Sequence, residues 1–130
     1  GGVVREPEKE DPGIRVISRE TARTVSGLLV GCVEYGTGKN AKIPGIECAG
    51  KTGSAQMTDV NSAGKVVYTA DRMASFVGYA PAYDPRVVVA VWVVKPHGST
   101  HGASVAAPAW KEITENTLRY LKIPFGADKR

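Results

Sequence analysis

Cysteine, histidine and long apolar runs are scarce in this chain of 130 residues, and each scarcity excludes a class of protein. Two cysteines, Cys32 and Cys48, are too few for a disulfide scaffold or a cysteine-based metal site. Buried free thiols are therefore expected, with a Cys32–Cys48 bridge left open. His97 and His101 lack a third ligand nearby, so no metal site is expected. The longest apolar run, Val87–Val94, is too short to cross a membrane.

Positive charge is not concentrated anywhere along the chain. There are 17 Lys and Arg against 13 Asp and Glu, a net charge of +4, and the basic residues form no run or RNA-type aromatic motif. This dispersed charge fits a solvated surface and argues against a nucleic-acid partner. No signal peptide is visible and the first residue is Gly1, so we interpret the chain as a processed, cleaved or engineered piece. Any membrane anchor would then lie in a segment absent from this sequence.

The first part of the chain divides into an arm and a helix. Residues 1–14 are rich in proline and charge and predict an arm or loop, which leaves residues 15–130 as the folded part. Ser18 is a candidate N-cap for a helix that ends near Gly36. Its expected inner stripe recurs at three- and four-residue steps and comprises Ala22, Val25, Leu29 and Cys32.

A second long helix is expected near the other end of the chain. It follows a loop over residues 95–102, takes Pro108 into its first turn and is stopped by Pro124. Apolar spacing predicts an inner stripe of Ala106, Trp110, Ile113, Thr117, Leu118 and Leu121.

Between the two helices the sequence predicts three strands. The first covers residues 47–57, where two glycines suit a strand that a neighbour approaches closely. A turn cluster at residues 61–64 precedes a short apolar run at 65–69. The second strand is expected at residues 72–80 and the third at Val87–Val94.

These elements predict an α+β fold in which three antiparallel strands are flanked by N- and C-terminal helices on one face of the sheet. Trp92 and Trp110 are expected to pack together between the third strand and the second helix. The third strand is apolar on both faces, which is typical of a central strand covered above and below. Because these residues supply no cover for the second face, we expect an incomplete fold.

The densest functional signal is the octapeptide AGKTGSAQ over residues 49–56. A lone Lys-Thr-Gly is weak, but further segments accompany it in a fixed order. They are Gly-Thr-Gly around Thr37, ASFVGYAP at residues 74–81, Asp-Pro-Arg at 84–86, the apolar run Val87–Val94 and GASVAAP at 102–108. Over roughly residues 15–125 this series resembles the class B penicillin-binding proteins, whose transpeptidase domains share the serine β-lactamase fold.

The resemblance implies roles for the residues of the Lys-Thr-Gly segment, on an edge strand that lines an acyl-transfer cleft. Lys51 would place positive charge beside the nucleophile and the substrate carboxylate. Thr52 and Ser54 would hold that carboxylate through charge-assisted hydrogen bonds. The backbone N–H of Ser54 would form half of an oxyanion hole, worth roughly 3–4 kcal/mol in comparable sites. Gly53 would leave room for substrate, and Ser54 keeps the hydroxyl where the family usually has Thr.

The family's nucleophile is not found in this sequence. Its mechanism needs a serine followed three residues later by lysine at a helix start, and a separate Ser-x-Asn, and both normally precede everything seen here. Ser62 and Lys65 match this spacing literally, but they lie in the predicted turn cluster after the Lys-Thr-Gly strand. We therefore expect the nucleophile in another polypeptide or a removed segment, and we expect this chain alone to be inactive.

A nucleotide-binding interpretation competes for the same residues. Residues 45–52 fit G-x-x-x-x-G-K-[ST], the phosphate-binding P-loop. That motif needs an apolar strand directly before it and a helix directly after it, and neither is predicted here. A P-loop nucleotide-binding protein is therefore a remote alternative.

The sequence thus predicts the C-terminal portion of a D,D-transpeptidase that cross-links peptidoglycan stem peptides through a serine acyl-enzyme. The alternative is a non-catalytic β-lactam-binding sensor or a structural relative of the same fold. By the resemblance, the partners would be the rest of the transpeptidase domain, the stem peptide and β-lactams. No metal or organic cofactor is implied, and the site of action would be the periplasmic or extracellular face of the cytoplasmic membrane.

Overall fold

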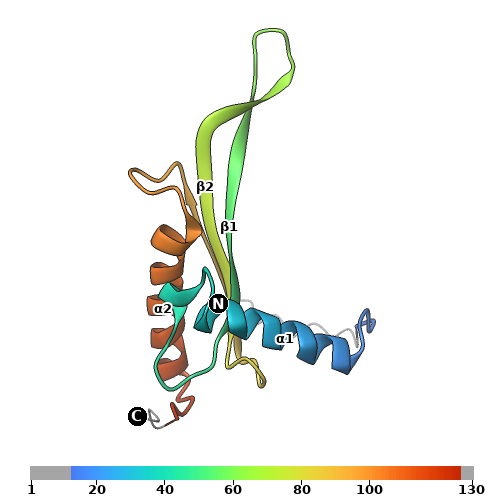
Figure 1. The fold of residues 1–130 in the computed structure, drawn as a ribbon, viewed down its shortest axis with the longest axis vertical. Coiled ribbons are helices and arrows are strands. Elements are labelled where there is room, and N and C mark those ends of the chain that lie inside the picture. The colour runs from blue at the N-terminus through green and yellow to red at the C-terminus, as the bar shows by residue number, and fades with distance from the viewer. Residues whose placement is uncertain (1–12, 127–130) are drawn as a thin grey trace, which may run out of the picture.

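The computed structural model describes residues 13–126 and contains two long helices and one three-stranded sheet (Figure 1). The expected arm over residues 1–14 lies almost entirely outside the described residues. In chain order the elements are α1 (Arg19–Glu34), the short 3₁₀ helix η1 (Lys39–Ala41), β1 (Ala49–Val60), β2 (Val66–Ala80), β3 (Val87–Val94) and α2 (Gly102–Tyr120). The predicted order of helix, three strands and helix is confirmed.

Helix α1 begins where the sequence predicts, but it buries a different stripe. The Ser18 hydroxyl accepts a hydrogen bond from the backbone N–H of Thr21 at 3.0 Å, which satisfies one of the free N–H groups of the first turn. The buried residues of the helix are Val30 and Val33, near its C-terminal end. Val25, predicted to face inward, is exposed, because only the last two turns of α1 lie against the sheet.

The sheet has the order β1-β2-β3, and both pairs are antiparallel. Residues 65–69 and 72–80, expected as separate segments, form one long strand, β2. Between Gln56 and Thr58 the register of β1 shifts at a β-bulge. The Thr69 hydroxyl donates to the carbonyl of Met57 there, at 3.3 Å. Beyond the bulge, β1 and β2 continue as a hairpin that projects away from both helices (Figure 1).

The two helices lie on opposite faces of the sheet, so the expectation that both cover one face is wrong. Trp110 of α2 packs against Phe76 with ring centroids 5.0 Å apart. Val30 of α1 packs instead with Ala49 and Tyr79, which are direct cross-strand partners. Side chains alternate along a strand, so residues 76 and 79 of β2 point to opposite faces. Figure 1 shows the sheet between α1 and α2 accordingly.

Helix α2 and the face that it covers form the main core. The indole N–H of Trp110 donates to the carbonyl of Val89 at 2.9 Å, so this buried aromatic has a partner for its polar atom. The predicted stripe is correct at Ala106, Trp110 and Leu118, whereas Ile113 and Leu121 are exposed and Thr114 is buried in their place. Pro108 is not in the first turn, because α2 begins as early as Gly102.

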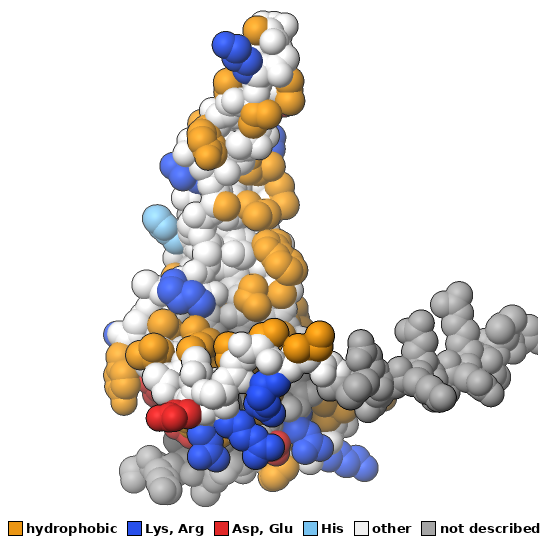
Figure 2. Space-filling model, turned by 90° about the vertical axis from the view of Figure 1, so that its right-hand side faces the viewer, with side chains coloured by type: hydrophobic (Ala, Val, Ile, Leu, Met, Phe, Trp, Pro, Cys, Tyr) orange, Lys and Arg blue, Asp and Glu red, His pale blue; other side chains and the backbone are white. Residues whose placement is uncertain are grey.

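The opposite face of the sheet is open over most of its length within residues 13–126. On β3 the burial alternates: the odd-numbered valines are half-buried toward α2, and the even-numbered residues are exposed. Trp92 is paired with Ser75 and 57% exposed, so its predicted packing against Trp110 is wrong. Figure 2 shows apolar side chains along the length of this side of the molecule. We call the exposed residues Val77, Val88, Trp92 and Val94 the open apolar face.

Candidate functional site

The segment Lys51 to Ser54 lies near the start of β1, at an edge of the sheet. Among the described residues β1 pairs only with β2, so its other side has no strand neighbour. The expectation of an edge strand is therefore confirmed. An edge strand can receive an extended peptide by backbone hydrogen bonding, which is one general mode of peptide recognition.

Side chains of this segment belong to both faces of the sheet. Thr52 and Ser54 pair across the strand with Phe76 and Ala74, so they belong to the face that α2 covers. Lys51 pairs with Val77 and belongs to the open face. Because the strand is at an edge, the long Lys51 side chain can reach around it. Its Nζ donates to the carbonyl of Thr52 at 3.0 Å and to the Thr52 Oγ1 at 3.2 Å.

Thr37 supplies a second contact to the same hydroxyl. Its Oγ1 lies 2.9 Å from the Thr52 Oγ1, and either oxygen can be the donor. Thr37 follows α1 directly, in a loop whose Gly38 is packed against the Phe76 ring and the backbone of α1. The Thr37 and Thr52 hydroxyls and the Lys51 ammonium group thus form one hydrogen-bonded chain.

Ser54 is joined to the beginning of α2. The backbone N–H of Gly102 donates to the Ser54 Oγ at 3.4 Å. A side chain at Gly102 would place its Cβ 2.3 Å from the Ser75 carbonyl and 2.7 Å from that of Gly53. Only glycine allows the helix to come this close to the sheet. At Gly53 a Cβ would lie 2.5 Å from the Ser75 Oγ, which is a movable side-chain atom.

This arrangement is suited to an anion. The hydroxyl groups of Thr52 and Ser54 and the ammonium group of Lys51 are hydrogen-bond donors, and Lys51 and Ser54 are exposed. A carboxylate placed between them would accept charge-assisted hydrogen bonds. Among residues 13–126, no group of three or more His, Cys, Asp or Glu side chains is placed to hold a metal ion. Nor does any helix in that range have the length and apolar character needed to span a bilayer.

The structure brings together the four predicted site residues, but two partners of the site were not assigned a role from sequence. Thr37 and Gly102 belong to segments that resemble the family, and the resemblance alone gives them no role. The Gly-Thr-Gly after a helix was the available signal for Thr37. The contact between Thr37 and Thr52 could not be predicted, because it depends on a loop that brings the chain back to the sheet and the spacing of residues does not show the path of a loop.

The literal Ser-x-x-Lys match does not form a nucleophile site. Ser62 and Lys65 lie in the turn at the hairpin tip, where Gly64 has a φ of 74°. The Asn61 side-chain oxygen accepts hydrogen bonds from the backbone N–H groups of Ala63 and Lys65, both at 3.0 Å. This Asx-type turn excludes the helical turn that would bring Lys65 against Ser62.

The P-loop interpretation is likewise wrong. After Lys51 and Thr52 the chain continues as strand β1 to Val60, where a phosphate-binding loop would be followed by a helix. Gly50 is explained by packing instead, because a Cβ there would lie 2.6 Å from the Phe76 ring.

Both cysteines are free in the structure, in different surroundings. Cys48 is buried in the core that Trp110 and Phe76 share, and its thiol donates to the Ile46 carbonyl at 3.6 Å. Burial raises the pKa of the Cys48 thiol to about 11. A protonated, buried thiol is a poor nucleophile, so Cys48 has no place in acyl-transfer chemistry.

Comparison with known proteins agrees with this geometry. The family model for the penicillin binding protein transpeptidase domain matches residues 2–115. Penicillin-binding protein PbpB of Mycolicibacterium smegmatis is 38% identical over 136 residues, covering 98% of this chain and 20% of the relative. The probable peptidoglycan D,D-transpeptidase PenA of Neisseria flavescens is 37% identical over 113 residues, covering 85% of this chain and 27% of the relative.

Solved structures show the same similarity. The transpeptidase domain of penicillin-binding protein 3 from Burkholderia pseudomallei superposes with a TM-score of 0.74 at 40% identity, over 87% of this chain and 34% of that one. The penicillin-binding protein 3 from Mycobacterium tuberculosis, solved with ampicillin, gives a TM-score of 0.73 at 33% identity. It is matched over 89% of this chain and 27% of its own.

The sheet, its two helices and the Lys-Thr-Gly edge match part of a penicillin binding protein transpeptidase domain. The chain belongs to the penicillin-binding protein transpeptidase family, and specifically to class B. It is a partial transpeptidase domain that spans about a fifth of the length of PbpB.

Proposed function

We propose that this chain forms the substrate-binding edge of a D,D-transpeptidase that cross-links peptidoglycan stem peptides through a serine acyl-enzyme. The observation that carries the proposal is the hydrogen-bonded chain of Thr37, Thr52 and Lys51 on an exposed edge strand. The relatives support it, because PenA is named as a probable peptidoglycan D,D-transpeptidase and a structural neighbour was solved with ampicillin.

In this proposal a stem peptide ending in D-Ala-D-Ala lies along β1. Its terminal carboxylate accepts hydrogen bonds from the Thr52 and Ser54 hydroxyls, and Lys51 supplies positive charge beside it. Gly53 lets the peptide lie against the strand. A serine outside this chain attacks the carbonyl of the bond between the two D-Ala residues, and the backbone N–H of Ser54 stabilises the oxyanion that forms. That bond then breaks, and the terminal D-Ala leaves as the free amino acid. The amine of a second peptide then resolves the acyl-enzyme. A β-lactam acylates the same serine.

This chemistry places the site where peptidoglycan is built, on the periplasmic or extracellular side of the cytoplasmic membrane. The rest of the transpeptidase domain is the required partner, since Ser62 and Lys65 are held in a turn and cannot act as the nucleophile pair. Neither a metal nor an organic cofactor takes part in the proposed steps.

Acylation by penicillin tests the proposal. In the complete protein, Lys51→Ala should slow acylation by a fluorescent penicillin at least about 100-fold, comparable to the loss of one oxyanion-hole donor. Lys65→Ala is the matched control, because it removes the same charge from the exposed hairpin tip. An unchanged rate in Lys51→Ala would remove Lys51 from the site.

Mass spectrometry of the acylated protein distinguishes the alternatives. We expect one adduct on a serine outside residues 1–130 and none on Ser62. A penicillin adduct together with no cross-linked product from a D-Ala-D-Ala peptide and an amine acceptor would favour a non-catalytic β-lactam sensor. No adduct on any polypeptide would contradict the proposed acyl-transfer site.

A further inference from the structure

A groove of about 680 Å³ lies beside the N-terminal half of α1, and no residue of the segment 51–54 lines it. One wall comes from α1 and the residues just before it, and the other from the connection between β2 and β3. Its lining includes Arg15, Arg19, Arg23, Ile17, Tyr83 and Pro85. Figure 2 shows Lys and Arg side chains gathered at the lower end of the molecule, with a few Asp or Glu side chains among them.

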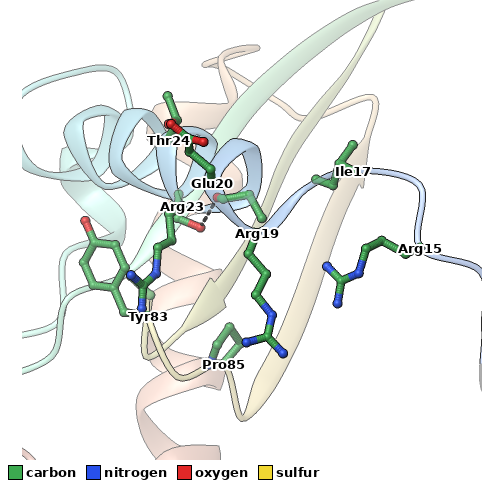
Figure 3. A pocket seen from close by; sticks show the side chains of 11 residues that line it. Arg15, Ile17, Arg19, Glu20, Arg23, Thr24, Tyr83 and Pro85 are labelled. Carbon is green, nitrogen blue, oxygen red and sulfur yellow. Dashed lines mark hydrogen bonds between the residues drawn. The ribbon is translucent and has the colours of Figure 1, made fainter.

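The three arginines point to the same side. In Figure 3 the side chains of Arg19 and Arg23 extend from one side of the helix toward Pro85 and Tyr83, and Arg15, from the segment before the helix, lies beyond Arg19 with its guanidinium group turned toward it. Glu20, which also lines the groove, lies with Thr24 on the other side of the helix in that view. In this view the Glu20 carboxylate does not lie between the arginine side chains.

Ion pairing within the chain does not neutralise these charges. Across residues 13–126, the salt bridges involve Lys42, Arg86, Lys95 and Arg119, and none involves Arg15, Arg19 or Arg23. Asp84, the acidic residue of the β2–β3 connection, lies 3.6 Å from Arg86. Three guanidinium groups thus share the groove with the single carboxylate of Glu20, and no salt bridge among the described residues joins any of them to it.

Holding these positive charges together is electrostatically unfavourable when the groove is empty. Arg19 and Arg23 are four residues apart on one helix, where like charges repel each other. Arg19 is also the first residue of α1, where the positive end of the helix dipole disfavours a cation. A bound anion would offset both repulsions at once.

We propose that this groove is a binding site for a phosphate-bearing ligand. Guanidinium groups present paired N–H donors that match the oxygens of a phosphoryl group. Three of them suit a group that has several acceptor oxygens and more than one negative charge. Ile17, Pro85 and the Tyr83 ring give the groove an apolar rim for an organic part of the ligand. The phosphoryl group can belong to a lipid headgroup or to a soluble phosphate ester.

Calorimetry on the complete protein with inorganic phosphate as the probe tests the site. The double variant Arg19→Gln/Arg23→Gln should lose at least tenfold in phosphate affinity. The control double variant Lys65→Gln/Arg72→Gln removes the same charge from the hairpin tip and from β2, outside the groove, and should change phosphate affinity less than twofold. Arg19→Lys/Arg23→Lys keeps the charge and loses the paired donors, so a several-fold loss is expected. Unchanged thermal melting verifies that each variant is folded.

Vesicle sedimentation identifies the source of the phosphoryl group. Retention on phosphatidylglycerol vesicles but not on phosphatidylcholine vesicles, lost in the Arg19→Gln/Arg23→Gln variant, would assign a lipid headgroup. Phosphate binding without vesicle binding would assign a soluble ester. Both results support the site.

Three results would overturn the proposal. The first is that neither probe binds, and the second is that the groove variant and the control variant weaken binding equally. The third concerns the acidic residues Glu6, Glu8, Glu10 and Asp11, which lie outside the described residues. If phosphate binds only after all four are changed to their amides, the groove is occupied by the chain's own carboxylates.

Discussion

The two faces of the sheet differ in how much of their cover this chain provides. On one face α2 buries Trp110, Phe76 and Leu118 completely. On the other face α1 covers only one end, around Ala49 and Tyr79, and the open apolar face remains exposed. Similar apolar side chains are thus buried or exposed according to the face of the sheet toward which they point.

The comparison shows that the sequence of a strand can suit burial on both faces of a sheet, although the other elements of the described chain cover only one of them. β3 is apolar on both faces, which suits a strand covered above and below. Its odd-numbered valines pack toward α2, whereas Val88 and Trp92 have no cover among the described residues. β1 connects the two regions, because Lys51 belongs to the open face and Thr52 to the covered one. The site forms at the edge, where residues of both faces can meet.

Replacing the tryptophan of the covered face should have the largest effect. Trp110→Ala in the complete protein removes a fully buried ring and leaves the Val89 carbonyl without its partner. We expect the free energy of unfolding to fall by about 3–5 kcal/mol. Urea denaturation measures it. Tyr120→Ala, on the exposed side of the same helix, is the control and should change stability by less than about 0.5 kcal/mol.

The tryptophan of the open face tests whether the rest of the protein covers it. In the 130-residue chain, Trp92→Ala should change the free energy of unfolding by less than about 0.5 kcal/mol and should reduce binding of a hydrophobic dye. In the complete protein the same change should cost about 3 kcal/mol, as for a buried ring. Equal small effects in both would mean that the open apolar face is never covered.

Because Cys48 is buried in the core of the covered face, its ionisation should make the free energy of unfolding depend on pH. Below about pH 9 the thiol is protonated in the folded and unfolded chains, so it adds no pH dependence. Between about pH 9 and its raised pKa of about 11, only the unfolded thiol ionises, and stability is lost as pH rises. The loss should total about 2–3 kcal/mol.

Urea denaturation of the complete protein from pH 8 to pH 11 measures this loss. Cys48→Ala should remove this part of the pH dependence, so the stability difference between the two proteins should shrink as pH rises. A difference that stays constant with pH would show that Cys48 ionises equally in both states.

Local patterns predicted the elements of this fold well. Ser18 marks the start of α1, the apolar run marks β3, and the turn at residues 61–64 separates β1 from β2. Each signal depends on residues close in sequence. The order of the segments around Lys51-Thr52-Gly53 likewise indicated the family, because it needs no knowledge of which face a residue occupies.

Assignments that depend on the partner of each face were less successful. Trp92 and Val25 were expected inside because they are apolar, but an apolar residue is buried only if something packs on it. Pro108 was placed in a first turn because proline is well tolerated there, whereas the approach of Gly102 to the sheet starts α2 earlier. The contact between Thr37 and Thr52 spans 15 residues and a change of direction, which no periodic pattern encodes.

The smallest predicted effect concerns the hydrogen bond between Thr37 and Thr52, the residue of the candidate site that belongs to the covered face. Thr37→Val keeps the shape of the side chain and removes the hydroxyl 2.9 Å from the Thr52 Oγ1. A neutral hydrogen bond contributes about 0.5–1.5 kcal/mol, so β-lactam acylation of the complete protein should slow about 2- to 12-fold. Thr37→Ser keeps the hydroxyl and should restore most of the rate. If Thr37 only supported the loop, both variants would lower the melting temperature and leave the acylation rate of the folded protein unchanged. Because Thr37 acts through Thr52, a Thr52→Val variant should lose all sensitivity to Thr37→Val, and additive losses in the double variant would contradict this positioning role.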